Sequence, residues 1–231
     1  MKRVLCVIML ISSLLLVSCG NGVDFGVCDD EYDRVGKNTI EAMVTALVEP
    51  QEAYETADLI AMVRIDKFDN AYFNSYSILG ETVFSATIIE TYEDRRTVKS
   101  KEIFIAQVGT PEGTMKGIPL YKTGDTFIMF LKVNLYNGVP YGDSYGDNVY
   151  SDINELHGVL QVISVNNERY VVNRMLGGFC KDIKASAVSE NVRGGVISAL
   201  YEYDSVLNKH AYAPSEVYKL STFSAFLEGL K

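Results

Sequence analysis

The chain has 231 residues and a formal net charge of −9, with 30 acidic side chains against 21 basic ones. This acidic balance excludes nucleic acid as an expected partner, because phosphates are repelled and no basic stripe overrides the repulsion. The length is enough for one sizeable core. With two histidines in the whole chain and no Cys-x-x-Cys pair, the sequence indicates no metal centre and no cofactor.

The N-terminus has the three-part layout of a secretory signal. Residues 1–3 are positively charged at Lys2 and Arg3, and residues 4–17 are apolar apart from two serines. The apolar stretch is too short for a lasting transmembrane helix. We therefore interpret residues 1–18 as a signal peptide.

The end of this signal, Leu16-Val17-Ser18-Cys19, resembles the bacterial lipobox. The resemblance implies cleavage before Cys19 and attachment of acyl chains such as palmitate to its thiol. Buried acyl chains hold a protein at a bilayer, so we expect a lipoprotein at the cell membrane, on its extracytoplasmic face. The alternative is an ordinary secreted protein with a chance cysteine.

Two further cysteines, Cys28 and Cys180, remain in the mature chain. An extracytoplasmic setting permits a disulfide between them. Two unrelated thiols are the alternative, because a single pair carries no spacing pattern.

Residues 19–38 are rich in glycine, aspartate and asparagine, and we interpret them as a tether before a single domain over residues 39–231. Residues 40–48 have helical apolar spacing, although the same residues can form a strand. Pro50 then opens a short helical turn.

From residue 57 the chain is dense in β-branched and aromatic residues. Strands are expected at residues 59–65, 82–92, 102–108, 126–133, 159–165 and 169–172. The last two form a hairpin across Asn166-Asn167. Turns rather than long helices join these strands, which predicts a mainly β fold with a small antiparallel barrel or sandwich.

The tail changes character, and we expect a helical C-terminal part over residues 185–231. Residues 186–207 contain helical segments that Gly194-Gly195 should break. Ser221 or Thr222 should cap a final short helix. The apolar side of that helix is expected to consist of Phe223, Phe226, Leu227 and Leu230.

The order of four segments, residues 57–63, 84–90, 103–109 and 124–131, resembles uncharacterised secreted or lipid-anchored bacterial proteins. Those proteins are similar in layout to netrin-like and tissue-inhibitor-of-metalloprotease modules. The resemblance implies an oligonucleotide/oligosaccharide-binding (OB) barrel over residues 57–172, with function in loops. The protease inhibitors chelate zinc through a free N-terminal cysteine, so a lipidated Cys19 does not carry that activity over.

The loop at residues 134–154 is a candidate binding site. Tyrosine offers flat, amphipathic contact surface, and carboxylates on a turn can coordinate calcium, although the spacing is not that of an EF-hand. The alternative is a solvated loop without a partner. The candidate residues are Tyr136, Tyr141, Asp143, Tyr145, Asp147, Tyr150 and Asp152.

Within this loop, Gly142-Asp143-Ser144-Tyr145-Gly146 matches the Gly-x-Ser-x-Gly pattern of serine hydrolases. A nucleophile elbow needs a strand before it and a helix after it, and neither is expected here. The sequence offers His157 or His210 as a base, and Asp152 or Glu155 as its orienting group.

We therefore favour a membrane-anchored extracytoplasmic binding module without catalytic residues. Its acidic surface favours a protein, peptide, glycan or cation as partner. A cell-envelope serine hydrolase and an accessory subunit of an envelope complex are the two other hypotheses.

Overall fold

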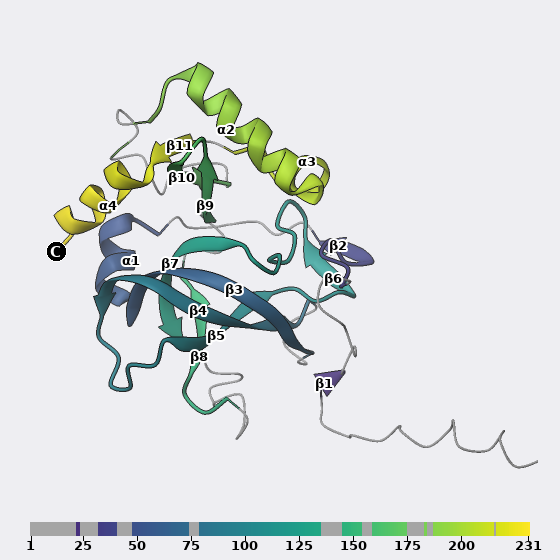
Figure 1. The fold of residues 1–231 in the computed structure, drawn as a ribbon. Helices are drawn as coiled ribbons and strands as arrows, with labels where there is room; N and C mark the ends of the chain where they lie inside the picture. Colours follow the sequence, from purple (N-terminus) through teal and green to yellow (C-terminus); the bar gives the residue numbers. More distant parts are fainter. Residues whose placement is uncertain are drawn as a thin grey trace, which may run out of the picture.

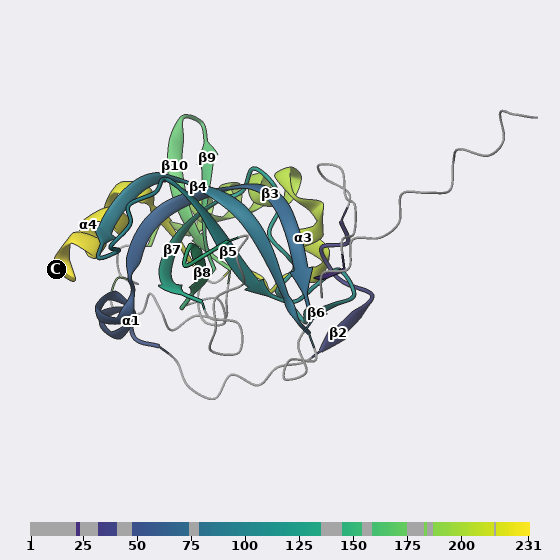
Figure 2. The ribbon, with the colours of Figure 1, turned by 90° about the horizontal axis from the view of Figure 1, so that it is seen from below.

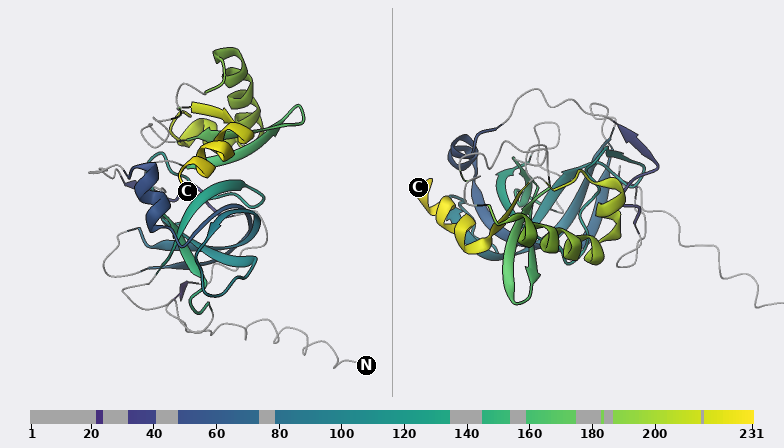
Figure 3. Two further views of the ribbon diagram at one scale, coloured as in Figure 1. Left: turned by 90° about the vertical axis from the view of Figure 1, so that its left-hand side faces the viewer. Right: turned by 90° about the horizontal axis from the view of Figure 1, so that it is seen from above.

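In a computed structural model of the chain, a small barrel is covered on one side by a second layer of strands and helices (Figures 1 and 3). None of the helices in the described part of the chain is long and apolar enough to cross a membrane. The structure describes residues 22–23, 32–40, 48–73, 79–134, 145–153, 159–174, 183, 187–214 and 216–231.

The barrel has five strands: β3 (Leu59–Tyr72), β4 (Glu81–Asp94), β5 (Glu102–Val108), β7 (Thr126–Val133) and β8 (Val149–Asp152). They are neighbours in the order β3-β4-β5-β8-β7, and β7 pairs back with β3, which closes the barrel. The pairs are antiparallel except β5–β8, which is parallel. The mainly β class and the OB-like barrel are confirmed, with one parallel pair where the sequence predicted antiparallel strands throughout.

β3 and β4 are unusually long, at 14 residues each, and arch over the barrel together (Figure 2). Their pairing shifts register at four places, the last between Phe68 and Asn70. Such bulges bend a strand and increase its twist, which lets a small barrel close. The prediction that β3 ends at residue 65 is wrong, because its continuation is paired with β4 as far as Tyr72.

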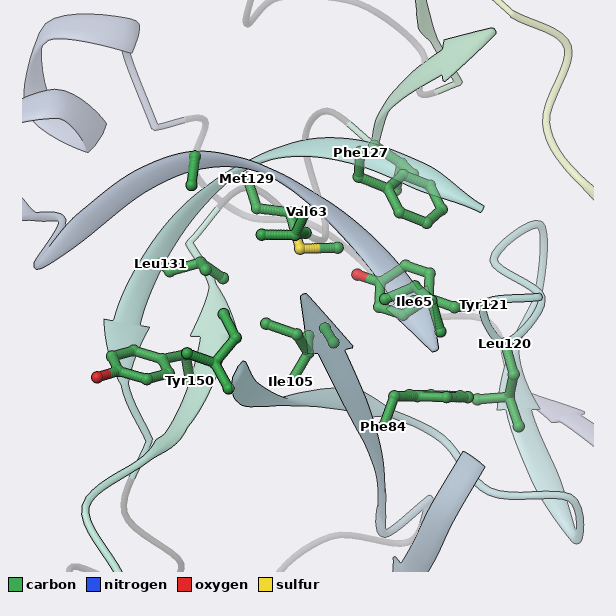
Figure 4. Packing of buried hydrophobic residues seen from close by; sticks show 14 of the residues in the cluster. Val63, Ile65, Phe84, Ile105, Leu120, Tyr121, Phe127, Met129, Leu131 and Tyr150 are labelled. Atoms are coloured by element: carbon green, nitrogen blue, oxygen red, sulfur yellow. The ribbon is translucent and has the colours of Figure 1, made fainter. Parts of the chain in front are cut away.

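Alternate residues of the strands fill the barrel interior, as the period of two in a strand requires. From β7, Phe127, Met129 and Leu131 point inward, where they meet β3 side chains such as Val63 and Ile65 (Figure 4). Each large apolar side chain that is fully buried contributes about 1.5–3 kcal/mol. This interior is the first of two main cores.

The second layer begins where β9 (Leu160–Val165) pairs with the first half of β7. β10 (Glu168–Asn173) and β11 (Glu216–Lys219) continue this sheet antiparallel. β7 therefore has two partners on one edge, since residues 126–128 pair with β9 and residues 131–133 pair with β8.

Helices and the outer faces of β3 and β7 enclose this second layer. One face of the β9–β11 sheet packs against Ile128 and Phe130 of β7 and against α1 (Pro50–Thr56) and α4 (Leu220–Gly229). These contacts form the second main core. The opposite face packs against α2 (Glu190–Tyr203) and α3 (Ser205–His210), which lie over it in Figure 3.

Three C-terminal details differ from the sequence prediction. α2 continues through Gly194-Gly195: buried Val196 and Leu200 hold it against the sheet, which outweighs a glycine cost of about 1 kcal/mol per residue. β11 was not predicted, and α4 begins at Leu220, ahead of the expected caps. The apolar side of α4 is confirmed, with Phe223 and Leu227 buried.

The N-terminal segment lies against the barrel. β1 (Gly22–Val23) pairs with the end of β3, and β2 (Asn38–Ile40) pairs in parallel with β6 (Gly113–Met115), a strand inside an expected loop. Tyr32 is buried, and its hydroxyl donates to the carbonyl of Tyr121. Part of the segment that we interpreted as a tether is thus packed on the domain.

The predicted β9–β10 hairpin is confirmed, and its turn gives a test of the local structure. Asn166 and Asn167 both have positive φ, 51° and 64°, the conformation of a type I′ turn. Asn167→Ala should lower the free energy of unfolding by about 1 kcal/mol, because alanine tolerates this conformation poorly. Asn167→Gly should keep the stability.

Urea denaturation of the two variants measures this difference. Asn208→Ala, an exposed change within α3, is the matched control. Equal stabilities of the Asn167→Ala and Asn167→Gly proteins would contradict the assignment.

Candidate functional site

The predicted binding loop is only partly within the described residues. Tyr145, Asp147, Tyr150 and Asp152 are described. Tyr136, Tyr141, Asp143 and Ser144 lie outside the described residues, as do Glu155, His157 and the cysteines Cys19, Cys28 and Cys180. His210 is exposed at the end of α3.

Tyr150 and Asp152 lie in strand β8 rather than in a loop. Tyr150 is buried in the barrel interior (Figure 4). Asp152 is also buried, and its Oδ1 accepts a hydrogen bond of 3.1 Å from the backbone N–H of Phe130. Phe130 lies between the β7 residues that pair with β9 and those that pair with β8. At this position the Asp152 side chain is the acceptor for the backbone N–H of Phe130.

Tyr145 is bound to the outside of the barrel. Its hydroxyl donates to a carboxylate oxygen of Asp69 on β3. Its ring meets Phe104 of β5 edge-on, with 4.6 Å between the centroids, and Tyr72 at 6.2 Å. Burial raises the pKa of the Tyr145 phenol, and Asp69 raises it further. Asp147, two residues on, is exposed in the turn before β8.

Two of these Tyr145 partners line a groove of about 470 Å³ on the β3–β4–β5 face. Its lining carries three carboxylates and one ammonium group. Arg64 is ion-paired with Asp66 at 2.9 Å, so the groove and its immediate surroundings have an excess of one negative charge. The polar lining consists of Asp66, Lys67, Asp69, Ser85, Glu102 and Asn148.

A second candidate lies at the junction of the barrel with the C-terminal layer, and sequence reasoning missed it. Three charged side chains there are almost fully buried: Asp125 is 2 % exposed, Arg174 4 % and Asp204 3 %. Charges are rarely buried in this way unless they are paired. Five segments that are far apart in the sequence contribute to this junction cluster, which consists of Arg34, Lys122, Asp125, Gln161, Arg174, Tyr203 and Asp204.

One half of the junction cluster is a chain of hydrogen bonds through Gln161. Arg174 donates from Nη1 to Oε1 of Gln161 at 3.1 Å. Gln161 donates in turn from Nε2 to Oδ1 of Asp125 at 3.0 Å. The other carboxylate oxygen of Asp125 accepts from the backbone N–H of Lys122. The amide thus bridges two opposite buried charges.

The other half is an ion pair between the N-terminal segment and the α2–α3 corner. Nη1 of Arg34 lies 2.6 Å from Oδ2 of Asp204, and Nε of Arg34 donates to the carbonyl of Leu120. Oδ1 of Asp204 accepts from the backbone N–H of Val206 and so caps α3. Truncation of one partner would leave a buried charge, which is costly.

Burial shifts the protonation equilibria of this junction cluster. It lowers the pKa of Arg174 to about 10, so that the guanidinium is still charged at neutral pH. It raises the pKa of Asp125, against the opposing pull of Arg174 and Arg34. Burial and Asp125 together raise the pKa of Tyr203 to about 12. Groups shifted in this way are frequent at functional sites.

Two cavities adjoin the junction cluster, and Tyr203 lines both. The larger, about 460 Å³, is bounded by Arg34, Lys122 and Asp204 among others. The smaller, about 300 Å³, reaches Asp125 and Gln161. No sequence motif marks this place, because each segment contributes only one or two of its polar residues.

Among the described residues, no group of three or more histidine, cysteine, aspartate or glutamate side chains is arranged to hold a metal ion. Comparison of the chain with protein-family models, with curated proteins and with solved structures finds no match. The groove and the junction cluster are therefore the features from which a function can be inferred.

The buried Asp125 predicts a distinctive pH dependence of stability. Its pKa is higher in the folded than in the unfolded chain, so its contribution to stability is complete below the unfolded pKa. That contribution is lost as pH rises through the folded pKa. Relative to Asp125→Asn, the wild type should lose free energy of unfolding with rising pH, by at most about 1.4 kcal/mol per pH unit.

Urea denaturation of both proteins between acid and neutral pH gives this difference directly. Asp147→Asn, which removes an exposed carboxylate, is the matched control. A wild type that gains free energy of unfolding relative to Asp125→Asn as the pH rises would show that the sign is wrong.

Proposed function

We propose that this protein is a lipid-anchored, extracytoplasmic binding module that holds a basic polypeptide segment in the groove on the β3–β4–β5 face. The observation that carries the proposal is the lining of this groove, in which carboxylates from β3 and β5 lie on either side of half-buried Ser85 of β4. Binding, and not catalysis, is the role assigned to the module.

Charge favours a basic ligand. Asp66 is already paired with Arg64, but Asp69 and Glu102 still outnumber Lys67 in the groove, and the whole chain carries −9. Oligonucleotides, which many OB barrels bind on this face, would meet repulsion from both. Lysine or arginine side chains of a partner would gain charge-assisted hydrogen bonds there.

A polypeptide fits this groove better than a glycan does. The sequence contains no tryptophan for stacking against sugar rings. The aromatic rings beside the groove, Phe104 and Tyr145, are packed edge-on against each other. The carboxylates of β3 and β5 can instead bind basic side chains that are suitably spaced along an extended segment.

Anchoring supports a partner in the cell envelope. The lipobox-like Leu16-Val17-Ser18-Cys19 would hold the mature chain at a membrane through acyl chains. The binding module would then meet envelope proteins at high local concentration. A serine hydrolase based on Ser144 and an accessory subunit of an envelope complex stay as alternative hypotheses.

The groove can be tested by photo-crosslinking in cells. A photoreactive amino acid at Lys67, an exposed groove position, should capture an envelope protein. Glu102→Lys should reduce that adduct severalfold, because it reverses one groove charge at an exposed strand end. Adduct yield on immunoblots is the measurement.

Glu202→Lys, the same charge reversal at an exposed position of α2, should leave the adduct unchanged. The proposal fails if Lys67 captures no protein, or if Glu102→Lys and Glu202→Lys act equally. An adduct with a polysaccharide would show a glycan ligand instead.

The anchor has a separate test. Metabolic labelling with a fatty-acid probe should tag the wild-type protein. Cys19→Ser should abolish the tag because it removes the thiol to which the lipid is expected to be attached. Cys28→Ser is the matched control and should stay labelled. Equal labelling of Cys19→Ser and wild type would exclude the lipoprotein assignment.

A further inference from the structure

Positive charge is in excess at the junction cluster, although the protein as a whole carries −9. The junction cluster contains three cationic side chains, Arg34, Lys122 and Arg174, and two buried carboxylates, Asp125 and Asp204. Inside a protein such charges interact more strongly than in water. The larger cavity itself is lined by Arg34 and Lys122 and by the carboxylates of Asp33 and Asp204, so its preference for an anion depends on unused hydrogen-bond donors and not on net charge.

Two arginine nitrogens in this junction cluster have no hydrogen-bond partner in the described structure, and only that of Arg34 belongs to a residue that lines a cavity. Both nitrogens, Nη2 of Arg34 and Nε of Arg174, are buried. Buried donors in native proteins are nearly always satisfied, by protein, by ordered water or by a ligand. Arg34 also lines the larger of the two cavities.

Lys122 is held in place but has binding capacity left. Its ammonium group donates to the carbonyl of Tyr203 at 3.1 Å and lies 3.9 Å from the centre of the Tyr203 ring. An ammonium group has three donors, and within the described structure no carboxylate pairs with this one. It lines the same cavity as Arg34.

The carboxylates beside this cavity are already occupied. Asp204 accepts from Arg34 and from Val206, and Asp33 accepts at Oδ1 from two backbone N–H groups of the following turn. The hydrogen-bonding groups still available in the cavity are therefore mostly N–H donors. A ligand that accepts hydrogen bonds is favoured there.

Tyr203 adds a flat apolar surface. It is 47 % exposed, and it lines both cavities beside the junction cluster. The larger cavity, about 460 Å³, has the size of a small-molecule site. A planar molecule can lie along this ring while its charged group reaches inward.

We infer that the cavity between the barrel and the α2–α3 corner is a binding site for a small organic anion. A carboxylate or phosphate group of the ligand lies between Lys122 and Arg34, and its apolar part lies against Tyr203. This site is separate from the groove on the β3–β4–β5 face and does not depend on the function proposed for that groove.

Isothermal titration of the full-length protein with benzoate, inorganic phosphate and benzylamine tests this inference. Benzoate should bind saturably and more tightly than phosphate, since only benzoate has a ring. Benzylamine, with the opposite charge, should not bind. Lys122→Gln should raise the Kd for benzoate at least tenfold, and Tyr203→Ala should weaken benzoate but not phosphate.

Lys132→Gln changes an exposed lysine of β7 and should leave the Kd unchanged. Lys122→Arg keeps the charge and should retain most of the binding, which separates loss of the ligand contact from loss of folding. No saturable binding of benzoate, tighter binding of benzylamine, or indifference to Lys122→Gln would each overturn the site.

Discussion

Strand β7 is apolar on both faces, and the rest of the fold follows from the need to bury both. Phe127, Met129 and Leu131 fill the barrel, while Ile128 and Phe130 point outward. The outer residues would be exposed on an isolated barrel. Each contributes about 1.5–3 kcal/mol when it is buried, so the second layer stabilises the barrel as much as the barrel supports the layer.

The same strand distributes the hydrogen bonds of the sheet. Its edge is shared between β9 and β8, and the side chain of Asp152 accepts from Phe130 at the division. Because β7 pairs with both parts of this sheet, the C-terminal strands are connected to the barrel through backbone hydrogen bonds as well as through side-chain contacts.

The junction cluster is placed where the N-terminal segment, the barrel and the α2–α3 corner meet. Burying so many charges contributes little net stability, since desolvation offsets attraction. The geometry of the junction cluster is nevertheless specific, because the ion pair between Arg34 and Asp204 requires the N-terminal segment and the α2–α3 corner to lie side by side. The groove on the β3–β4–β5 face is instead acidic and is built mainly from neighbouring strands. We therefore propose ligands of opposite charge for the two places.

The sequence by itself determined the strand-rich middle, the turn at Asn166-Asn167 and the apolar side of α4, because these depend on local spacing and conformational preference. It also determined the acidic charge. Only the tertiary structure decided the parallel β5–β8 pair, the length of β3 and the strands β8 and β11, because short or polar strands are stabilised by partners distant in the chain. The junction cluster had no sequence signal for the same reason: its charges come together only when five separate segments fold around β7.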